Sequence, residues 1–152
     1  MNKIKKLLLA VFLLVVSFNS FGEVIRNQLY AYPITRVIDG DTVEFQATFL
    51  PPPLKPVLAL RVYGVDTPEG KPLAKCFDEY QKATFAKEFT KLWISMAYQE
   101  GKTVLIEIIS HDKYGGRVLG DVVIDGERLS QALIAQGHAK PYKGGKKSSW
   151  CS

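Results

Sequence analysis

The chain has 152 residues, which suits one domain and is short for two. Hydrophobic residues make up 47% and charged residues 23% of the sequence, which excludes a wholly disordered chain, a collagen-like repeat and a protein with several membrane spans. The formal net charge is +5 at pH 7, but Lys3, Lys5 and Lys6 lie in the first 22 residues, where there is no acidic residue. The remaining 17 Lys and Arg residues against 15 Asp and Glu residues leave +2, so the net charge indicates no particular partner.

Residues 1–22 have the pattern of a secretory signal peptide. The three lysines form a positive region, residues 7–16 are an unbroken apolar run, and Ser20 and Gly22 place small residues before a cleavage site ahead of Glu23. An uncleaved membrane anchor is the alternative, although a spanning helix needs about 20 apolar residues. We therefore expect a mature domain of residues 23–152 that is periplasmic or secreted and has no contact with the membrane.

Strand patterns occupy the first half of the mature chain. Residues 34–38 form a short apolar stretch before an Asp-Gly turn signal, and residues 42–49 alternate between apolar and polar side chains, as a half-buried strand does. Residues 51–56 contain four prolines, which cannot donate ladder hydrogen bonds, so they are predicted to connect two strands. Alternation resumes over residues 57–64, which we predict to be the next strand.

The period changes over residues 78–98, which predict an amphipathic helix ending before Gly101. The residues expected to form its inner face are Phe85, Phe89, Leu92, Trp93 and Met96. Two further strands are predicted over residues 103–109 and 118–124, followed by a short helix over residues 127–136. This order of elements predicts an α+β protein in which a five-stranded Greek-key barrel of the OB type carries one long and one short helix.

Two cysteines remain in the mature chain, Cys76 and Cys151. An even number of cysteines in an oxidising compartment predicts a disulfide, which would join the last residues to the middle of the chain. A free catalytic thiol is the alternative, but neither cysteine has a nearby histidine in the sequence.

Acidic residues gather in two short loops at strand ends. Asp39 and Asp41 lie in the first loop, and Asp66 and Glu69 lie in the second. Each loop alone is typical of a simple turn. If the two loops meet, however, their carboxylates repel one another unless a proton or a cation intervenes. An oxygen-only cluster without histidine or thiolate favours Ca²⁺ or Mg²⁺ over zinc.

Basic and aromatic residues complete a set of groups that suits phosphoryl transfer. Arg61 is the one charged residue in the strand predicted over 57–64, and Arg117 follows a turn with two glycines. Guanidinium groups and a cation neutralise phosphate charge, while a carboxylate activates water. Lys113 and Tyr114 could hold a neighbouring phosphate, and Tyr142 could stack a base. A purely structural role for these residues is the alternative.

Four motifs occur in an order that resembles the staphylococcal nuclease (thermonuclease) family, from about residue 34 to residue 142. They are Ile-Asp-Gly-Asp-Thr-Val at 38–43, Leu-Arg-Val-Tyr-Gly-Val-Asp-Thr-Pro-Glu at 60–69, Asp-Lys-Tyr-Gly-Gly-Arg at 112–117 and Ala-Leu-Ile-Ala-Gln-Gly-His-Ala-Lys at 132–140. The second motif is the most specific, since it holds an arginine, an aspartate and a glutamate in ten residues.

The resemblance implies an OB-fold hydrolase that uses Ca²⁺ to cleave DNA and RNA at the 5′ P–O bond, leaving 3′-phosphate products. It implies metal ligation by Asp41, Asp66 and the Thr67 carbonyl. It implies that Glu69 is the general base and that Arg61 and Arg117 clamp the phosphate. Lys113, Tyr114 and Tyr142 fall near nucleotide-contacting positions of the family. We expect a monomer without a stable protein partner.

The sequence departs from the family pattern by an additional glycine in Gly115-Gly116, which affects the placement of Arg117. Lys143, Lys146 and Lys147 would form a basic edge beside Tyr142, or belong to a solvated tail. Two alternatives to an enzyme are a non-catalytic OB-fold module that binds nucleic acid and a disulfide-linked envelope protein whose acidic loops are only turns.

Overall fold

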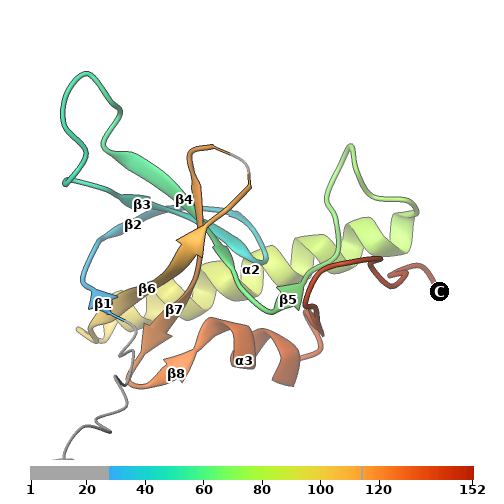
Figure 1. Ribbon diagram of the computed structural model, residues 1–152. Coiled ribbons are helices and arrows are strands. Elements are labelled where there is room, and N and C mark those ends of the chain that lie inside the picture. Colours follow the sequence, from blue (N-terminus) through green and yellow to red (C-terminus); the bar gives the residue numbers. More distant parts are fainter. Residues whose placement is uncertain (1–27, 114) are drawn as a thin grey trace, which may run out of the picture.

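The computed structural model describes residues 28–113 and 115–152 (Figure 1). Helix α2 (Phe77–Gln99) is long and helix α3 (Leu129–Ala135) is short, as the sequence predicts, and the fold is of the α+β class. The nine strands in these residues are β1 (Leu29–Tyr30), β2 (Ile34–Asp39), β3 (Thr42–Gln46), β4 (Val57–Val62), β5 (Val65–Asp66), β6 (Val104–His111), β7 (Arg117–Ile124), β8 (Glu127–Arg128) and β9 (Lys140–Pro141). The predicted signal peptide lies outside the described residues.

Seven strands form the main sheet, in the order β1-β6-β7-β4-β3-β2 with β8 paired to β7. The β4–β7 pair is parallel, whereas the other pairs in this sheet are antiparallel. Strands β5 and β9 form a separate antiparallel pair. The β5–β9 pair places the chain after α3 beside the second acidic loop.

The expectation of a five-stranded barrel with two helices is confirmed only in part, because the described residues hold more than five strands and their pairings close no barrel. The strands of five or more residues are β2, β3, β4, β6 and β7, but four two-residue strands accompany them. Strands β1 and β2 end the main sheet, and no strand pairing within the described residues joins them into a closed barrel. Two-residue strands are too short to show an alternating pattern, so the sequence could not reveal them.

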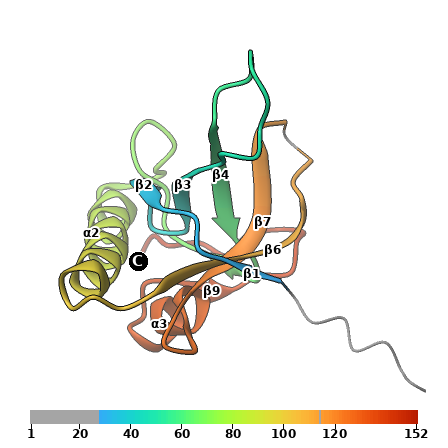
Figure 2. The same cartoon turned by 90° about the vertical axis from the view of Figure 1, so that its left-hand side faces the viewer.

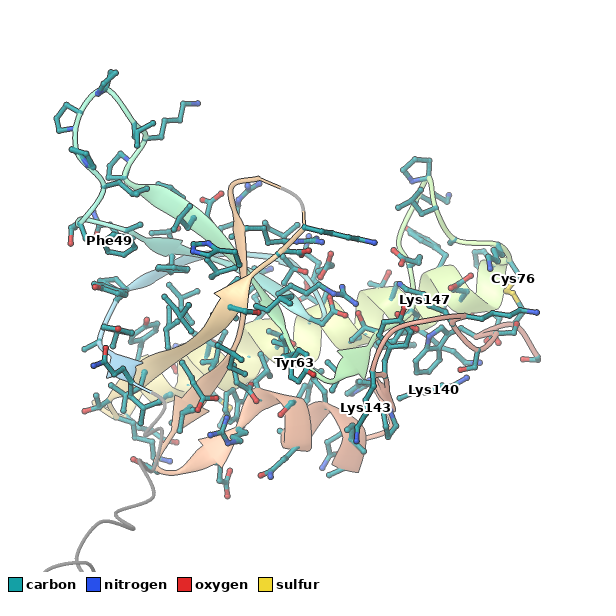
Figure 3. The ribbon with its side chains drawn as sticks, in the orientation of Figure 1. Phe49, Tyr63, Cys76, Lys140, Lys143 and Lys147 are labelled. Atoms are coloured by element: carbon teal, nitrogen blue, oxygen red, sulfur yellow. A yellow bond between two sulfur atoms is a disulfide. The ribbon has the colours of Figure 1, made fainter. Side chains whose placement is uncertain are left out.

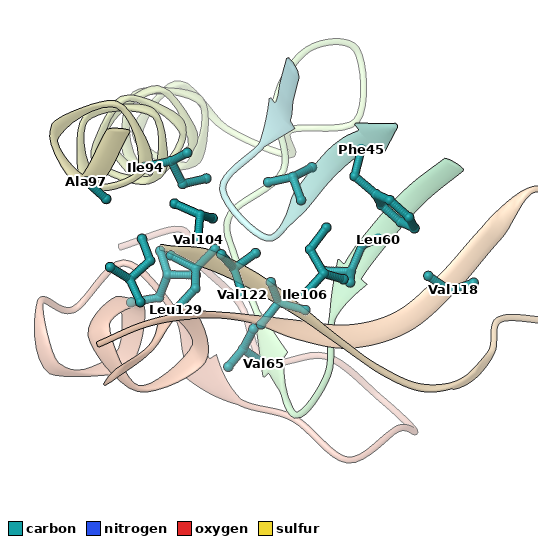
Figure 4. Close-up of a cluster of buried hydrophobic side chains, with 14 of the residues drawn as sticks. Phe45, Leu60, Val65, Ile94, Ala97, Val104, Ile106, Val118, Val122 and Leu129 are labelled. Carbon is teal, nitrogen blue, oxygen red and sulfur yellow. The ribbon is translucent and has the colours of Figure 1, made fainter. Parts of the chain in front are cut away.

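The core lies between the main sheet and the two helices (Figure 4). Alternation along the strands holds as predicted, because Val43 and Phe45 of β3 and Leu60 and Val62 of β4 are buried, and Val43 pairs with Leu60 across the two strands. Helix α3 adds Leu129, which is also fully buried. The proline-rich segment connects β3 and β4 as predicted and projects from the sheet (Figure 2).

Helix α2 covers the predicted residues, but its inner face is only partly the predicted one: Phe89 and Trp93 pack against the core as expected, and small residues fill the rest of this face. Its buried residues are Glu79, Ala83, Ala86, Thr90, Ile94 and Ala97, whereas Phe85, Leu92 and Met96 are 64%, 59% and 53% exposed. The reason is close packing: a Cβ atom at Gly40 would lie 2.8 Å from Ala86 Cβ. Thr90 Oγ1 also donates a hydrogen bond to the Gly40 carbonyl at 2.7 Å. Small side chains therefore bring α2 against the β2–β3 turn that carries Asp41.

The predicted disulfide between Cys76 and Cys151 is present. Cys76 is the N-cap residue of α2, and its sulfur accepts a hydrogen bond from the Glu79 N–H. The bond brings the last residues of the sequence to the start of this helix (Figure 1). In the described part of the chain, neither helix has the length and apolar character that a membrane span requires.

Candidate active site

A cleft of about 780 Å³ opens between the end of β4, the β6–β7 connection and the chain after β9. The residues predicted from the sequence that line it are Arg61, Glu69, Lys113, Arg117 and Tyr142. The predicted metal ligands Asp41, Asp66 and Thr67 do not line this cleft and are only 2%, 3% and 4% exposed. Tyr114 lies outside the described residues.

The two arginines reach the cleft because of the β4–β7 register. Arg117 is the first residue of β7 and pairs with Ala59 of β4. Since residues two apart in a strand share a face, Arg61 and Arg117 project from the same face of the sheet. The turn before Arg117 requires glycine at Gly116, whose φ is +80°. The additional glycine thus leaves Arg117 on the cleft, where its Nε lies 2.5 Å from Asp112 Oδ2.

Asp41 links the two acidic loops. Its Oδ2 accepts a hydrogen bond from the Thr67 N–H at 3.3 Å, so the β2–β3 turn contacts the segment after β5. Its Oδ1 accepts a hydrogen bond from Arg61 Nη1 at 3.0 Å, and Arg61 Nη2 donates to the Val65 carbonyl. Burial raises the pKa of Asp41 to about 6; the Arg61 guanidinium opposes this rise and the neighbouring Asp39 carboxylate adds to it.

Asp66 is held by two residues of the C-terminal segment. Its Oδ2 accepts a hydrogen bond from Trp150 Nε1 at 3.2 Å. Its Oδ1 lies 2.7 Å from Lys147 Nζ in an ion pair, and the described residues supply no hydrogen bond to this oxygen. The same Nζ donates a hydrogen bond to Glu69 Oε1, also at 2.7 Å. Burial lowers the pKa of Lys147, but the two carboxylates raise it more, so the net pKa lies above its usual value.

Glu69 has an exposed side chain on a fixed backbone. Its side chain is 37% exposed, whereas its N–H donates a hydrogen bond to Glu79 Oε1. Glu79 is 4% exposed, and its second oxygen accepts a hydrogen bond from the Lys75 N–H at 2.8 Å. The first turn of α2 therefore anchors both ends of the loop that follows Glu69.

Sequence reasoning missed Glu79 and Trp150 and left Lys147 between two interpretations. An acidic residue in the first turn of a helix is common, so Glu79 gave no signal that it binds a loop. The structure places Lys143 and Lys147 on the cleft, together with Tyr63, which is 52% exposed (Figure 3). Lys146 is exposed and does not line the cleft.

Oxygen atoms are the candidate metal ligands in this region. Within residues 28–113 and 115–152, the one group of three His, Cys, Asp or Glu residues whose ligand atoms lie within 4.8 Å of one another is Cys76, Glu79 and Cys151. Its sulfur atoms form a disulfide and are not thiolates, so this group does not suit a metal. Asp41 and Asp66 with Glu69 do not form such a group. The two buried aspartates and the Thr67 carbonyl still offer hard donors, and in the described residues the one partner of Asp66 Oδ1 is the positive charge of Lys147, so this oxygen fits a hard divalent cation.

This arrangement places two guanidinium groups and an accessible carboxylate around one cleft, with Asp41 and Asp66 buried behind residues that line it. Guanidinium groups recognise phosphate oxygens, and the carboxylate can accept a proton from water. Lysines and two tyrosines on the same cleft suit the backbone and bases of a polynucleotide.

Comparison with known proteins gives a family match over residues 59–149, to the family described as staphylococcal nuclease homologue, whose domain has the OB-fold. This range includes Arg61, Asp66, Glu69 and Arg117 and begins after Asp41. The chain is also similar to proteins named "Uncharacterized endonuclease" from Escherichia coli and Escherichia coli O157:H7. Each is 28% identical over 111 residues, which are 72% of this chain and 60% of the relative. The chain thus spans less than two thirds of the length of these relatives.

Proposed function

This chain belongs to the staphylococcal nuclease family, and from this premise we propose that it is an exported endonuclease that hydrolyses phosphodiester bonds in DNA and RNA. One observation carries the proposal: the parallel β4–β7 pairing brings Arg61 and Arg117 to one cleft with Glu69. A module that only binds nucleic acid needs no general base beside its arginines. Export depends on the signal-peptide pattern of residues 1–22.

In the proposed reaction, water attacks phosphorus and the 5′ P–O bond breaks, which leaves a 3′-phosphate on one product and a 5′-hydroxyl on the other. Glu69 accepts a proton from the attacking water. Arg61 and Arg117 stabilise the charge on the phosphate oxygens, and Arg117 donates a hydrogen bond to the leaving 5′ oxygen, which is protonated by solvent. Because these groups contact phosphate and not the sugar, both DNA and RNA are substrates.

Substrate binding is proposed to follow the positive side of the cleft. Lys113 and Lys143 line it near Tyr142, so phosphates flanking the cleaved bond would lie against the lysines while a base stacks on the tyrosine. Tyr114, which follows Lys113 in the sequence, is proposed for a neighbouring phosphate. These contacts are largely independent of base sequence, which predicts little sequence preference.

The proposed cofactor is Ca²⁺, bound by Asp41, Asp66 and the Thr67 carbonyl. A bound Ca²⁺ ion supplies positive charge that neutralises the phosphate. The protein residues provide two carboxylates that are nearly inaccessible to water, so a cation there would be held in surroundings of low polarity, where its charge acts strongly.

Cleavage of single-stranded DNA and RNA by the purified protein tests the proposal, in Ca²⁺, in Mg²⁺ and in EDTA, with analysis of the fragment ends. We expect fragments with 3′-phosphate ends in Ca²⁺ and none in EDTA. Fragments with 3′-hydroxyl ends would contradict the mechanism. Binding of the same single strands without cleavage under all three conditions would instead support the non-catalytic binding module.

A further inference from the structure

The last six residues form a strap, residues 147–152, that is fixed to the body of the protein on both sides. Cys151 is bonded to Cys76, and Ser152 Oγ donates a hydrogen bond to Asp78 Oδ2 at 2.6 Å. The backbone carbonyls of Ser149 and Trp150 accept hydrogen bonds from two lysines outside the strap, Lys140 and Lys82. The strap therefore has a defined path past the second acidic loop (Figure 3).

The first residue of the strap places a positive charge between two carboxylates. Lys147 Nζ lies 2.7 Å from Asp66 Oδ1 and 2.7 Å from Glu69 Oε1. The Asp66 side chain is 4% exposed, so little water reaches it, and apart from Lys147 the described residues give its Oδ1 no hydrogen-bond partner. A buried carboxylate oxygen needs a positive partner, and Lys147 supplies it.

We infer that Lys147 is a resident counter-ion of the proposed cation site and sets its affinity for divalent metal by competition. This inference rests on the proposed function, in which Asp66 is a metal ligand. A divalent cation and the Lys147 ammonium group cannot both contact Asp66 Oδ1 as closely as 2.7 Å without strong repulsion. Cation binding therefore requires the ammonium group to withdraw.

The strap makes this competition effective and reversible. Because Cys151 is bonded to α2, the ammonium group returns to the carboxylates without an entropic cost for ordering a free tail. The Lys147 side chain is 37% exposed and lines the cleft, so it can withdraw toward solvent while the strap keeps its place. Without metal, Lys147 therefore neutralises the carboxylates of the site, and only a cation of higher charge displaces its ammonium group.

Titration of the full-length protein with Ca²⁺ alone, by calorimetry at fixed ionic strength, tests this inference. We expect Lys147→Gln to bind Ca²⁺ about tenfold more tightly than the wild type, within the usual range of coupling between two sites. The matched control is Lys146→Gln, which removes the same charge one position earlier. Lys146 has no ion pair in the described part of the chain, so its replacement should leave the affinity unchanged.

The first of three outcomes separates the inference from the proposed function. Wild-type binding with equal or weaker affinity in Lys147→Gln would overturn the inference and leave the Ca²⁺ proposal intact. Binding in Lys147→Gln but not in the wild type would support both. No binding in either would overturn both. Circular dichroism checks that Lys147→Gln is folded. If it is not, Lys147→Met gives the same test, because methionine keeps most of the aliphatic side chain and removes the charge.

Discussion

Trp150 Nε1 donates a hydrogen bond to Asp66 Oδ2 at 3.2 Å and joins two residues that are 84 positions apart in the sequence. Both side chains are buried, and Lys140 Nζ lies over the face of the indole ring, 4.2 Å from its centre. One oxygen of Asp66 thus accepts a hydrogen bond from Trp150, while the other contacts the positive charge of Lys147. The strap therefore does more than close the fold, because it orients a proposed metal ligand.

Trp150→Phe keeps an aromatic ring but removes this donor. We expect the free energy of unfolding without divalent cations to fall by about 2 kcal/mol, since a hydrogen bond to a charged group contributes about 1.5–3 kcal/mol. Urea denaturation measures the change. Trp93→Phe is the matched control, because Trp93 is only partly buried in α2. In an Asp66→Ala background the cost of Trp150→Phe should shrink; an equal cost in both backgrounds would contradict the assignment.

Glu69→Gln tests the proposed general base. The replacement keeps the shape of the side chain and the backbone hydrogen bond to Glu79 but cannot accept a proton from water. We expect kcat for hydrolysis of single-stranded DNA to fall by about 10²–10⁴-fold with little change in melting temperature. Glu88→Gln, on the exposed outer side of α2, is the control. Near-normal turnover in Glu69→Gln would remove Glu69 from the mechanism.

The two arginines should differ in what else they support. Arg61→Ala and Arg117→Ala should each lower the hydrolysis rate by about 10³–10⁵-fold, by analogy with arginines in other phosphoryl transfers. Arg61 also pairs with Asp41, whose side chain is 3% exposed, so Arg61→Ala should additionally cost about 3 kcal/mol of unfolding free energy. Arg117 is paired with Asp112, whose side chain is 7% exposed, but Arg117 itself is more exposed than Arg61 (28% against 20%), so Arg117→Ala should cost somewhat less.

Single-turnover rates and denaturation curves of the two variants separate these effects. An equal loss of unfolding free energy in Arg61→Ala and Arg117→Ala would mean that the Arg61–Asp41 pair does not stabilise the protein more than the Arg117–Asp112 pair does. A normal rate in Arg117→Ala would mean that the Arg117 guanidinium does not contact the reacting phosphate, because the additional glycine before Arg117 displaces it.

The sequence predicted those parts of the protein that depend on local patterns. Alternation in β3 and β4 identifies their buried faces, because successive strand residues point to opposite sides. The inner face of α2 was predicted only in part: Phe89 and Trp93 pack against the core, but Phe85, Leu92 and Met96 are exposed. Which helical face is buried depends on how closely the helix packs, and the contact of Gly40 with Ala86 favours the face with small residues.

The contacts of the strap could not be predicted, although the disulfide could. Two cysteines in an exported chain suggest only one intramolecular pairing. The contacts of Lys147 and Trp150 with Asp66 depend instead on the path of the chain after β9. If the residues along this path were shifted by one position, Asp66 would have different neighbours. Likewise, acidic residues such as Glu79 are common in the first turn of a helix, and only the fold brings the Glu69 N–H to this carboxylate.

Reduction of the Cys76–Cys151 bond should affect the site as well as stability. The two cysteines are 75 positions apart, and closing a loop of this length stabilises a protein by at most about 4–5 kcal/mol in the chain-entropy description. Because the strap is otherwise held by a few hydrogen bonds and ion pairs, we expect it to detach at a lower temperature than the body of the protein unfolds. The hydrogen bond from Trp150 to Asp66 would then be lost. Because this bond orients a proposed metal ligand, nuclease activity would fall at a lower temperature than the helices melt.

Tryptophan fluorescence follows this detachment in a Trp93→Phe background, where Trp150 is the remaining tryptophan. The indole is 9% exposed, so its release into water should shift the emission to longer wavelength. After dithiothreitol treatment, or in Cys76→Ser with Cys151→Ser, this shift should precede the loss of helical circular dichroism on heating; in the oxidised protein the two should coincide. If the fluorescence shift and the loss of circular dichroism also coincide in the reduced protein, the disulfide is not needed to hold the strap. The contacts of Lys147, Trp150 and Ser152 would then suffice to keep it against the acidic loop and the start of α2.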